Sequence, residues 1–460
     1  MIRLGLLLCI FAKLATSLED RVIHIDQGPV RGYRPKGEDY FEFYNIPYAT
    51  APSGENKFAA PLPAPKWKKT LEAVQNFVVC PQGERTRNGK VVNKNPKYKT
   101  KEDCLIANIF VPDTNKTSLP VLVFFHGGAY QFTYGAIRSP THLLESKKVV
   151  IVNFNYRLGP HGFLSLGTKD IPGFADVNNL KKLEAFYKNL SYDKLFSIDF
   201  DHSTDSSTGF GPCVEPDVGQ ERFLDDYPIN ILKSGNYAKL PMLYGISKME
   251  GVYRIDDFKS SIDKINKNFS QFLPMDLKFK DKEDQKEVEN KIKKFYFHDT
   301  PVDKEDATEF IQYYTDIIFA VGAARCVELQ VAAGNKQVYL YQYEFVDKNE
   351  PYIKYTHTRG AGHTAGNYAL MDSGDESNLS PEYRKMKKVM RDLWLNFITT
   401  GNPVVSGSPY PKWPAVNGES LNYMVLNSTL SVKPDFHKES LQFWHKIYKN
   451  HYKHPIAAEN

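Results

Sequence analysis

The chain has 460 residues, of which 42% are hydrophobic and 25% are charged, with 29 Gly and 28 Pro. These values exclude collagen, low-complexity disorder and a coiled coil. Lys and Arg number 59 and Asp and Glu number 54, and the two signs are interleaved along the chain. A nucleic-acid partner is therefore not expected.

The first segment, MIRLGLLLCIFAKLATS, combines an early Arg3, an apolar run and small residues before Leu18. This order is typical of a secretory signal peptide, so we expect residues 1–17 to be removed. The apolar run is too short to span a membrane, and no later stretch reaches spanning length. The sequence thus predicts a secreted, extracellular protein without a membrane span; a buried N-terminal helix is the alternative.

Four cysteines remain in the mature chain: Cys80, Cys104, Cys213 and Cys326. An oxidising compartment favours pairing, and Cys80 and Cys104 are the pair closest in sequence. A disulfide between them would contribute roughly 3–4 kcal/mol. The sequence leaves open whether Cys213 and Cys326 pair.

N-glycosylation sequons begin at Asn115, Asn189, Asn268, Asn378 and Asn427. Asn378 precedes Ser380-Pro381, which often blocks use, so the expected glycan sites are Asn115, Asn189, Asn268 and Asn427. Each glycan would mark a surface position.

Four unbroken apolar runs, rich in β-branched and aromatic residues, predict strands that are covered on both faces. They occupy residues 119–125, 149–155, 240–246 and 337–345. Helical spacing of apolar residues follows at 304–332 and 385–399, and the charged stretch 278–294 favours a solvated helix or loop. Alternating strands and helices predict an α/β fold with a mainly parallel sheet, as one mature domain at 18–460.

The segment HGGAY (126–130) directly follows the first of these strands. Adjacent glycines let successive backbone N–H groups turn into a cleft, where they can bind the oxyanion of a tetrahedral intermediate. A tight turn without chemistry is the alternative. The neighbouring motifs favour the chemical interpretation.

Nine segments occur in one order along the chain: GPVRGY (28–33), FYNIPYATAP (43–52), EDCLIANIFVP (102–112), HGGAY (126–130), NYRLGPHGFLSLG (155–167), GPCVEP (211–216), GISKMEGV (245–252), GAGHTAGN (360–367) and TTGNP (399–403). This series resembles the type-B carboxylesterase family, in the branch of secreted insect esterases. The resemblance covers nearly all of the mature chain. It implies an α/β-hydrolase fold and hydrolysis of carboxylic esters through Ser, Glu and His, without a cofactor or metal, on a small apolar ester or another hydrophobic ligand.

The same resemblance places the catalytic acid at Glu250 and the histidine at His363, and it implies a disulfide between Cys80 and Cys104. A Glu just after a strand end can accept the imidazole N–H and fix its tautomer. Without the resemblance, Glu250 would be taken for a surface or capping carboxylate and His363 for a loop histidine. Thr364 and the residues after it depart from the acidic residues that usually follow this histidine.

The resemblance also places the loop donors of the oxyanion hole at Gly128 and Ala129. A third donor would come from the residue that follows the nucleophilic serine. The sequence, however, contains no Gly-x-Ser-x-Gly segment. Ser207 is followed by Gly209, but Asp205 precedes it; it would be the first serine to test if a nucleophile were present.

The position of the missing nucleophile is predicted from the motif order. After Gly173 the chain passes directly into FADVNNLKKLEAFYKNLSYDKLFS, which resembles a later helical region of the family. A helix–strand–helix–strand stretch of on the order of 60–100 residues is therefore expected to be absent near 173/174. Without those central strands, either the sheet closes by sliding or two apolar strand edges stay exposed.

Two functions fit this sequence. The first is a carboxylesterase-family protein without triad catalysis. The second is a non-catalytic binding or sequestering protein on the same scaffold, an idea that rests on fold-level analogy. Residual hydrolysis by a water activated at His363 is a weaker third possibility.

Overall fold

A computed structural model of the chain describes residues 19–83, 86–87, 90–91, 97–138, 141–165, 180–196, 210–219, 221–371 and 375–453. The predicted signal peptide, the predicted junction near 173/174 and Ser207 lie outside the described residues. Among the helices of these segments, none combines the length and the apolar character that crossing a membrane requires.

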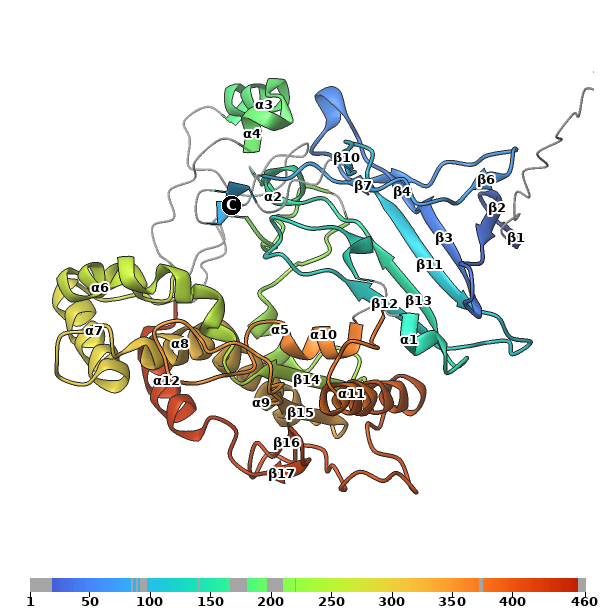
Figure 1. Ribbon diagram of the computed structural model, residues 1–460. Helices are drawn as coiled ribbons and strands as arrows, with labels where there is room; N and C mark the ends of the chain where they lie inside the picture. Colours follow the sequence, from blue (N-terminus) through green and yellow to red (C-terminus); the bar gives the residue numbers. More distant parts are fainter. Residues whose placement is uncertain are drawn as a thin grey trace, which may run out of the picture.

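The N-terminal half forms one sheet with the strand order β1-β2-β3-β11-β13-β12, and β6 lies beside β2 (Figure 1). The strands are β1 (Asp20–Ile25), β2 (Gly28–Tyr33), β3 (Tyr40–Pro47), β6 (Leu71–Glu72), β11 (Ile106–Pro112), β12 (Val121–Phe125) and β13 (Val150–Phe154). The short pairs β4 (Ala49–Thr50) with β5 (Leu62–Pro63), β7 (Val78–Val79) with β10 (Lys99–Thr100), and β8 (Thr86–Arg87) with β9 (Lys90–Val91) lie outside it.

The connections explain the mixed direction of this sheet. β1 and β2 are joined by only Asp26 and Gln27, a length that permits a hairpin but no parallel crossover. β1 and β2 are accordingly antiparallel. The pairs β2–β3, β3–β11 and β11–β13 are also antiparallel, whereas β13 and β12 are parallel. The chain between these two includes helix α1 (Thr141–Leu144) and is long enough for a crossover.

A second sheet in the C-terminal half has the order β14-β15-β16-β17. Its strands are β14 (Met242–Ser247), β15 (Val338–Tyr343), β16 (Tyr423–Leu426) and β17 (Ser431–Lys433), of which the first three run parallel. Every residue of β15 is buried, as its unbroken apolar run predicts. The prediction of a parallel sheet thus holds for the strands nearest the candidate site.

Helices cover this second sheet (Figure 1). The predicted helical region 304–332 contains α8 (Ala307–Thr315), a π-helical turn (Asp316–Ala320) and α9 (Val321–Ala332), and the region 385–399 lies in α11 (Pro381–Thr400). The other α-helices are α2 (Gly159–Phe163), α3 (Leu180–Asn189), α4 (Tyr192–Phe196), α5 (Pro228–Ser234), α6 (Phe258–Lys267), α7 (Lys282–Phe297), α10 (Ala365–Met371) and α12 (Lys438–His451). Short 3₁₀ turns span Gly54–Asn56, Gly135–Ile137, Glu250–Asp257 and Phe269–Phe272.

The stretch 278–294, expected to be solvated, is mostly within α7 and is not fully exposed. Val288 and Ile292 are buried in the core, because one face of the helix packs on α8. The many charged residues on the opposite face make the segment look fully polar when only its composition is considered.

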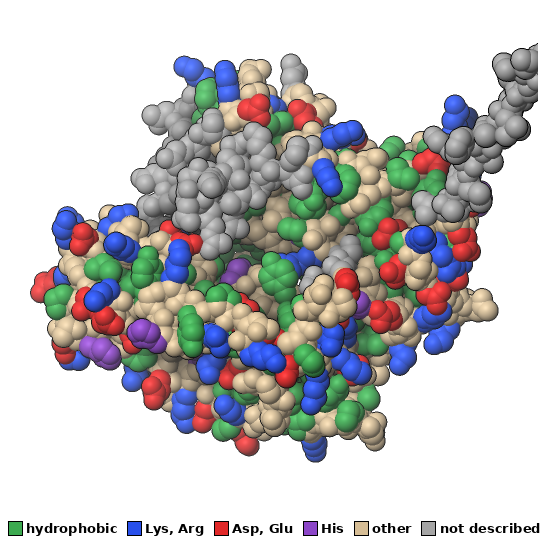
Figure 2. All heavy atoms as spheres, in the orientation of Figure 1, with side chains coloured by type: hydrophobic (Ala, Val, Ile, Leu, Met, Phe, Trp, Pro, Cys, Tyr) green, Lys and Arg blue, Asp and Glu red, His purple; other side chains and the backbone are tan. Residues whose placement is uncertain are grey.

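The two sheets share one hydrophobic core. A cluster of buried side chains joins Phe110 and Ile151 of the first sheet to Tyr341 and Met424 of the second. A separate cluster fills the space among the second sheet, α6–α9 and α12. Figure 2 shows basic and acidic side chains intermingled over the visible face, in keeping with the interleaved charges of the sequence.

β12 and β14, the last strand of the first sheet and the first strand of the second, each lie at the edge of their sheet. Among the described strands β12 pairs only with β13 and β14 only with β15, so no ladder joins the two sheets. The sequence predicted that β12 is covered on both faces, but Val121, Val123 and Phe125 are 55%, 46% and 68% exposed. Alternate side chains of a strand point to opposite faces, and only one face of β12 is packed. Among the described strands, β12 and β14 therefore each have one unpaired edge.

A disulfide joins Cys80, just after β7, to Cys104, just before β11. Cys213 and Cys326 are free thiols. Of the predicted glycan sites, Asn115, Asn189 and Asn268 are exposed and Asn427 is half-buried.

Candidate active site

Glu250 lies three residues beyond the end of β14, where the strand passes into a 3₁₀ turn. Its side chain is only 8% exposed. The backbone N–H of Ser247 donates to Glu250 Oε1 over 2.7 Å. This bond satisfies one carboxylate oxygen inside the protein and leaves the other, Oε2, to face a second partner.

That partner is His363, whose Nδ1 lies 2.6 Å from Glu250 Oε2. The two residues are 113 positions apart in the sequence, so the tertiary structure brings the predicted pair together. A carboxylate at Nδ1 favours the tautomer in which Nδ1 carries the proton and Nε2 is the free base. The imidazole is 42% exposed, so this arrangement can move a proton at the surface of the site.

The histidine loop is held against the turn that carries the glutamate. Met249 N–H donates to the carbonyl of Ala361 over 2.9 Å, and Met249 pairs with Gly362 in a parallel bridge. A Cβ at Gly360 would lie 2.1 Å from Met249 Sδ. The glycines of GAGHTAGN therefore permit the close approach of the two loops.

Aromatic rings flank the imidazole. Tyr253 lies 5.4 Å and Phe319 lies 5.1 Å from His363, measured between ring centroids. Phe319 belongs to the π-helical turn, and the preceding Thr315 accepts a hydrogen bond from Gly251 N–H over 2.9 Å. Sequence analysis missed these side chains, because their positions depend on the packing of α8 rather than on a motif.

A cavity of about 260 Å³ adjoins the histidine. Rings of Tyr343, Phe345, Tyr368 and Tyr383 form much of its wall, and His363 is part of its lining. Small-molecule sites commonly have apolar walls with a few polar groups. Asp347 and Glu350 line the cavity as well, so its wall combines aromatic rings with carboxylates beside the imidazole.

The predicted oxyanion loop has an unusual backbone. Gly128, Ala129 and Tyr130 have φ of 122°, 52° and 62°, and the turn is closed by hydrogen bonds from Gln131 and Phe132 N–H to the Gly128 carbonyl. A Cβ at Gly128 would lie 2.2 Å from the Phe132 carbonyl oxygen, so only glycine fits there. Among the described residues, the N–H groups of Gly128 and Ala129 donate to no partner. They are available to an oxyanion.

Neighbouring side chains fix this loop. The His126 ring stacks on Tyr156 at 4.3 Å, and the Tyr156 hydroxyl donates to the His126 carbonyl over 2.8 Å. Gln82 exchanges two hydrogen bonds with the backbone of Thr133. Burial lowers the pKa of His126 to about 4, so this histidine is neutral near pH 7. It supports the loop by packing and by the contact of its Nδ1 with the Thr133 hydroxyl at 2.7 Å.

The loop-bearing half contacts the histidine-bearing half directly. The guanidinium of Arg138, which follows the 3₁₀ turn Gly135–Ile137, lies 3.8 Å from the ring centroid of Tyr368 in α10. Tyr368 follows His363 by five residues, so the cation–π contact ties the two segments to one another. The third participant that the motifs imply, an elbow serine, is absent from the sequence, and Ser207 lies outside the described residues.

Comparison with known proteins adds a family and a fold. A sequence profile of the "Carboxylesterase family" matches residues 19–176 and 174–444. Venom carboxylesterase-6 of Apis mellifera is 26% identical over 532 aligned positions, which cover 91% of this chain and 93% of the relative. A carboxylic ester hydrolase of Bombus ignitus is 24% identical and covers 91% of this chain and 93% of its own length.

Among solved structures, juvenile hormone esterase from Manduca sexta, solved with OTFP covalently attached, has a TM-score of 0.76. It is 21% identical, and the match covers 94% of this chain and 100% of the other. The likeness confirms the predicted α/β-hydrolase fold. At 21% identity, this likeness is evidence for the fold and not for a shared activity.

Proposed function

Since the chain belongs to the carboxylesterase family, we propose that it is a member of that family that does not hydrolyse esters through an acyl-enzyme. It retains the Glu250–His363 pair and the loop donors Gly128 and Ala129. It lacks the nucleophile. The observation that carries the proposal is the absence of any Gly-x-Ser-x-Gly segment from the sequence.

Three observations support an internal deletion as the reason. The family profile matches in two pieces that meet at residues 174–176, beside the junction expected near 173/174. The alignment with the Apis mellifera relative has 532 positions, more than the 460 residues of this chain. The exposed apolar face of β12 and the separate sheet edge at β14 are what the loss of intervening strands would leave.

The chemistry follows from the parts that remain. His363, oriented by Glu250, is the base that would take the proton of an attacking hydroxyl. Without a serine there is no oxygen to form the acyl bond, and the donor N–H of the following residue is missing too. Loss of one oxyanion donor typically costs about 10²–10³ in rate, and loss of a nucleophile leaves about 10³–10⁴ over water only where hole and pocket are intact.

The test is hydrolysis of p-nitrophenyl acetate by the purified secreted chain, beside the Glu250→Gln and His363→Ala variants. We expect the three proteins to have the same rate, equal to that of a denatured control, and no covalent adduct with a fluorophosphonate probe. Turnover above that background that both substitutions abolish would disprove the proposal. Peptide mapping of the labelled chain would then find the nucleophile, with Ser207 examined first.

A second candidate function is the binding of a small apolar ester or another hydrophobic ligand without turnover. The cavity of about 260 Å³ beside His363, with its aromatic wall, favours this function. Binding of p-nitrophenyl acetate measured by saturation-transfer NMR would test it. A signal that is lost on cavity filling with Ala365→Trp, and kept in His363→Ala, would support a binding role, whereas no saturation transfer to the ester would exclude it for this ligand class.

Secretion is part of the same proposal. The signal-peptide pattern at residues 1–17 and the sequons at exposed asparagines support an extracellular glycoprotein. Intact-mass analysis of protein from the medium should show a chain that begins near Leu18 and loses mass on treatment with an N-glycosidase. An uncleaved chain without added sugar would contradict it.

A further inference from the structure

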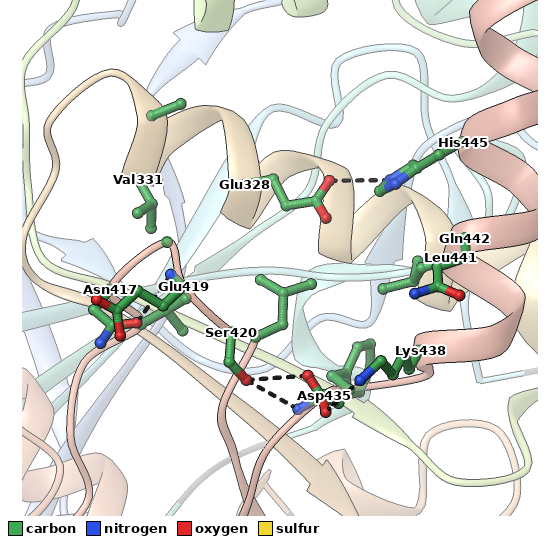
Figure 3. Close-up of a pocket in the computed structure, with 15 residues that line it drawn as sticks. Glu328, Val331, Asn417, Glu419, Ser420, Asp435, Lys438, Leu441, Gln442 and His445 are labelled. Atoms are coloured by element: carbon green, nitrogen blue, oxygen red, sulfur yellow. Dashed lines mark hydrogen bonds and ion pairs between the residues drawn. The ribbon is translucent and has the colours of Figure 1, made fainter.

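A second, larger cavity is drawn in Figure 3. Neither Glu250 nor His363 lines it, and it has no lining residue in common with the cavity beside His363. Its volume is about 690 Å³, within the range of about 300–1,000 Å³ that is common for small-molecule sites. Helices α9 and α12 border it together with the loops around 416–421 and 435–436. Nothing in the family chemistry described above uses this place.

The inner wall of the cavity is apolar. It is formed by Val331 from the end of α9, Val416 and Leu421 from one loop, Phe436 from the other and Leu441 from α12. Val416, Phe436 and Leu441 are themselves 3%, 0% and 4% exposed, so this wall belongs to the packed core rather than to a loose surface. Val331 and Leu421 are half-buried, and they present the accessible part of this wall to an alkyl chain or ring.

Five ionisable side chains line the rest: Glu328, Glu419, Asp435, Lys438 and His445. Two pairs are internal, since His445 Nε2 lies 3.1 Å from Glu328 and Lys438 Nζ donates to Asp435 over 2.9 Å. Asp435 also exchanges hydrogen bonds with Ser420. Glu419 has no ion pair among the described residues.

Carboxylates therefore outnumber permanent cations in this lining by three to one, since the imidazole of His445 is charged only when protonated. Glu328 is partly withdrawn from water, and burial raises the pKa of its carboxyl group. A half-buried carboxylate is stabilised by a cation that reaches it. The chemistry of the lining thus matches a ligand with one positive charge and an apolar body.

We propose that this cavity binds an amphipathic ammonium, an alkyl- or arylalkylamine whose apolar part lies on Val331 and Leu421 and whose ammonium group faces the half-buried carboxylate of Glu328. An ammonium group carries three N–H donors, and a carboxylate accepts hydrogen bonds at both of its oxygens. The site is independent of ester hydrolysis, so it can operate whether or not the chain has a nucleophile.

The test is calorimetric titration of the full secreted chain with octylammonium, octanol and octanoate, which share one alkyl chain and differ in charge. We expect octylammonium to bind at one site per chain, octanol to bind at least about tenfold more weakly, and octanoate not to bind. Equal affinity for octylammonium and octanol would overturn the proposal, because the carboxylates would then contribute nothing.

Variants locate the site. Glu328→Gln should weaken octylammonium binding by about tenfold, whereas Glu287→Gln, at an exposed position of α7 remote from the cavity lining, should not change it. Ala332→Phe, at an exposed lining position, should block the cavity with an unchanged far-ultraviolet spectrum. Binding that survives Ala332→Phe, or that responds equally to Glu287→Gln and Glu328→Gln, would place the ammonium elsewhere and refute the assignment.

Discussion

His161 in α2 should make the protein sensitive to mild acid. It is 1% exposed, its ring lies edge-on to Tyr192 at 4.7 Å, and among the described residues neither ring nitrogen has a hydrogen-bond partner. Burial, reinforced by the positive charges of Arg157 and Lys57, lowers its pKa from 6.5 to about 3. The perturbation is His161→Leu, which removes the titrating group.

The sign follows from proton binding in the two states. Between pH 6.5 and pH 3 the unfolded chain takes up a proton at this position and the folded chain does not, so stability is full above pH 6.5 and falls as the pH falls. At pH 5.0, about 1.5 units below the unfolded pKa, the loss from this one residue is about 2 kcal/mol. This loss in stability does not depend on the exact pKa of His161 in the folded chain, provided that this pKa is well below 5.

The assay is urea unfolding at pH 7.5 and pH 5.0, followed by far-ultraviolet circular dichroism. We expect the drop in the free energy of unfolding between the two pH values to be about 2 kcal/mol smaller in His161→Leu than in the parent chain. At pH 7.5 the variant should be within about 1 kcal/mol of the parent, because no hydrogen bond is lost. His24→Leu, at an exposed position of β1, is the matched control and should keep the parent's drop.

A variant that loses as much stability as the parent between pH 7.5 and pH 5.0 would refute the reasoning. It would mean that the folded chain protonates His161 at little cost. Equal effects of His161→Leu and His24→Leu would lead to the same conclusion, since burial would then not distinguish the two histidines.

Three further predictions concern the pair, the disulfide and the open edge. Glu250→Ala should lower the free energy of unfolding by about 2–3 kcal/mol, because it leaves the buried N–H of Ser247 unpaired. His363→Ala should lower it by less than about 1 kcal/mol in the same urea assay, because the imidazole is 42% exposed. Replacement of Cys80 and Cys104 by serine should cost about 3.5 kcal/mol for a 24-residue separation, and non-reducing peptide mapping of the parent should find the two joined rather than alkylated. Val123→Lys, on the exposed face of β12, should reduce self-association in sedimentation velocity without lowering stability; unchanged association would show that this face is not used.

Local pattern was enough for much of the fold. The four unbroken apolar runs became β12, β13, β14 and β15, because a strand that packs on its neighbours needs β-branched and aromatic side chains whatever lies far away in the sequence. The helix-spaced residues of 385–399 likewise lie in α11.

The candidate pair was found through motifs and not through physics alone. Glu250 by itself resembles a capping carboxylate, and only the order of the neighbouring segments selects it together with His363. The structure supplies the 2.6 Å contact and the buried N–H that holds the carboxylate. No periodicity encodes a contact across 113 residues.

What the sequence determined by itself is the family motifs, the lack of an elbow serine and the identity of the inner strands. The tertiary structure alone decided which face of β12 stays open, that Phe319 flanks the imidazole, and that one side of the charged helix α7 is buried. Each of these three features depends on which other segment packs against the surface concerned. A side chain's type fixes what it can pack against, but only the path of the whole chain fixes whether a partner is there.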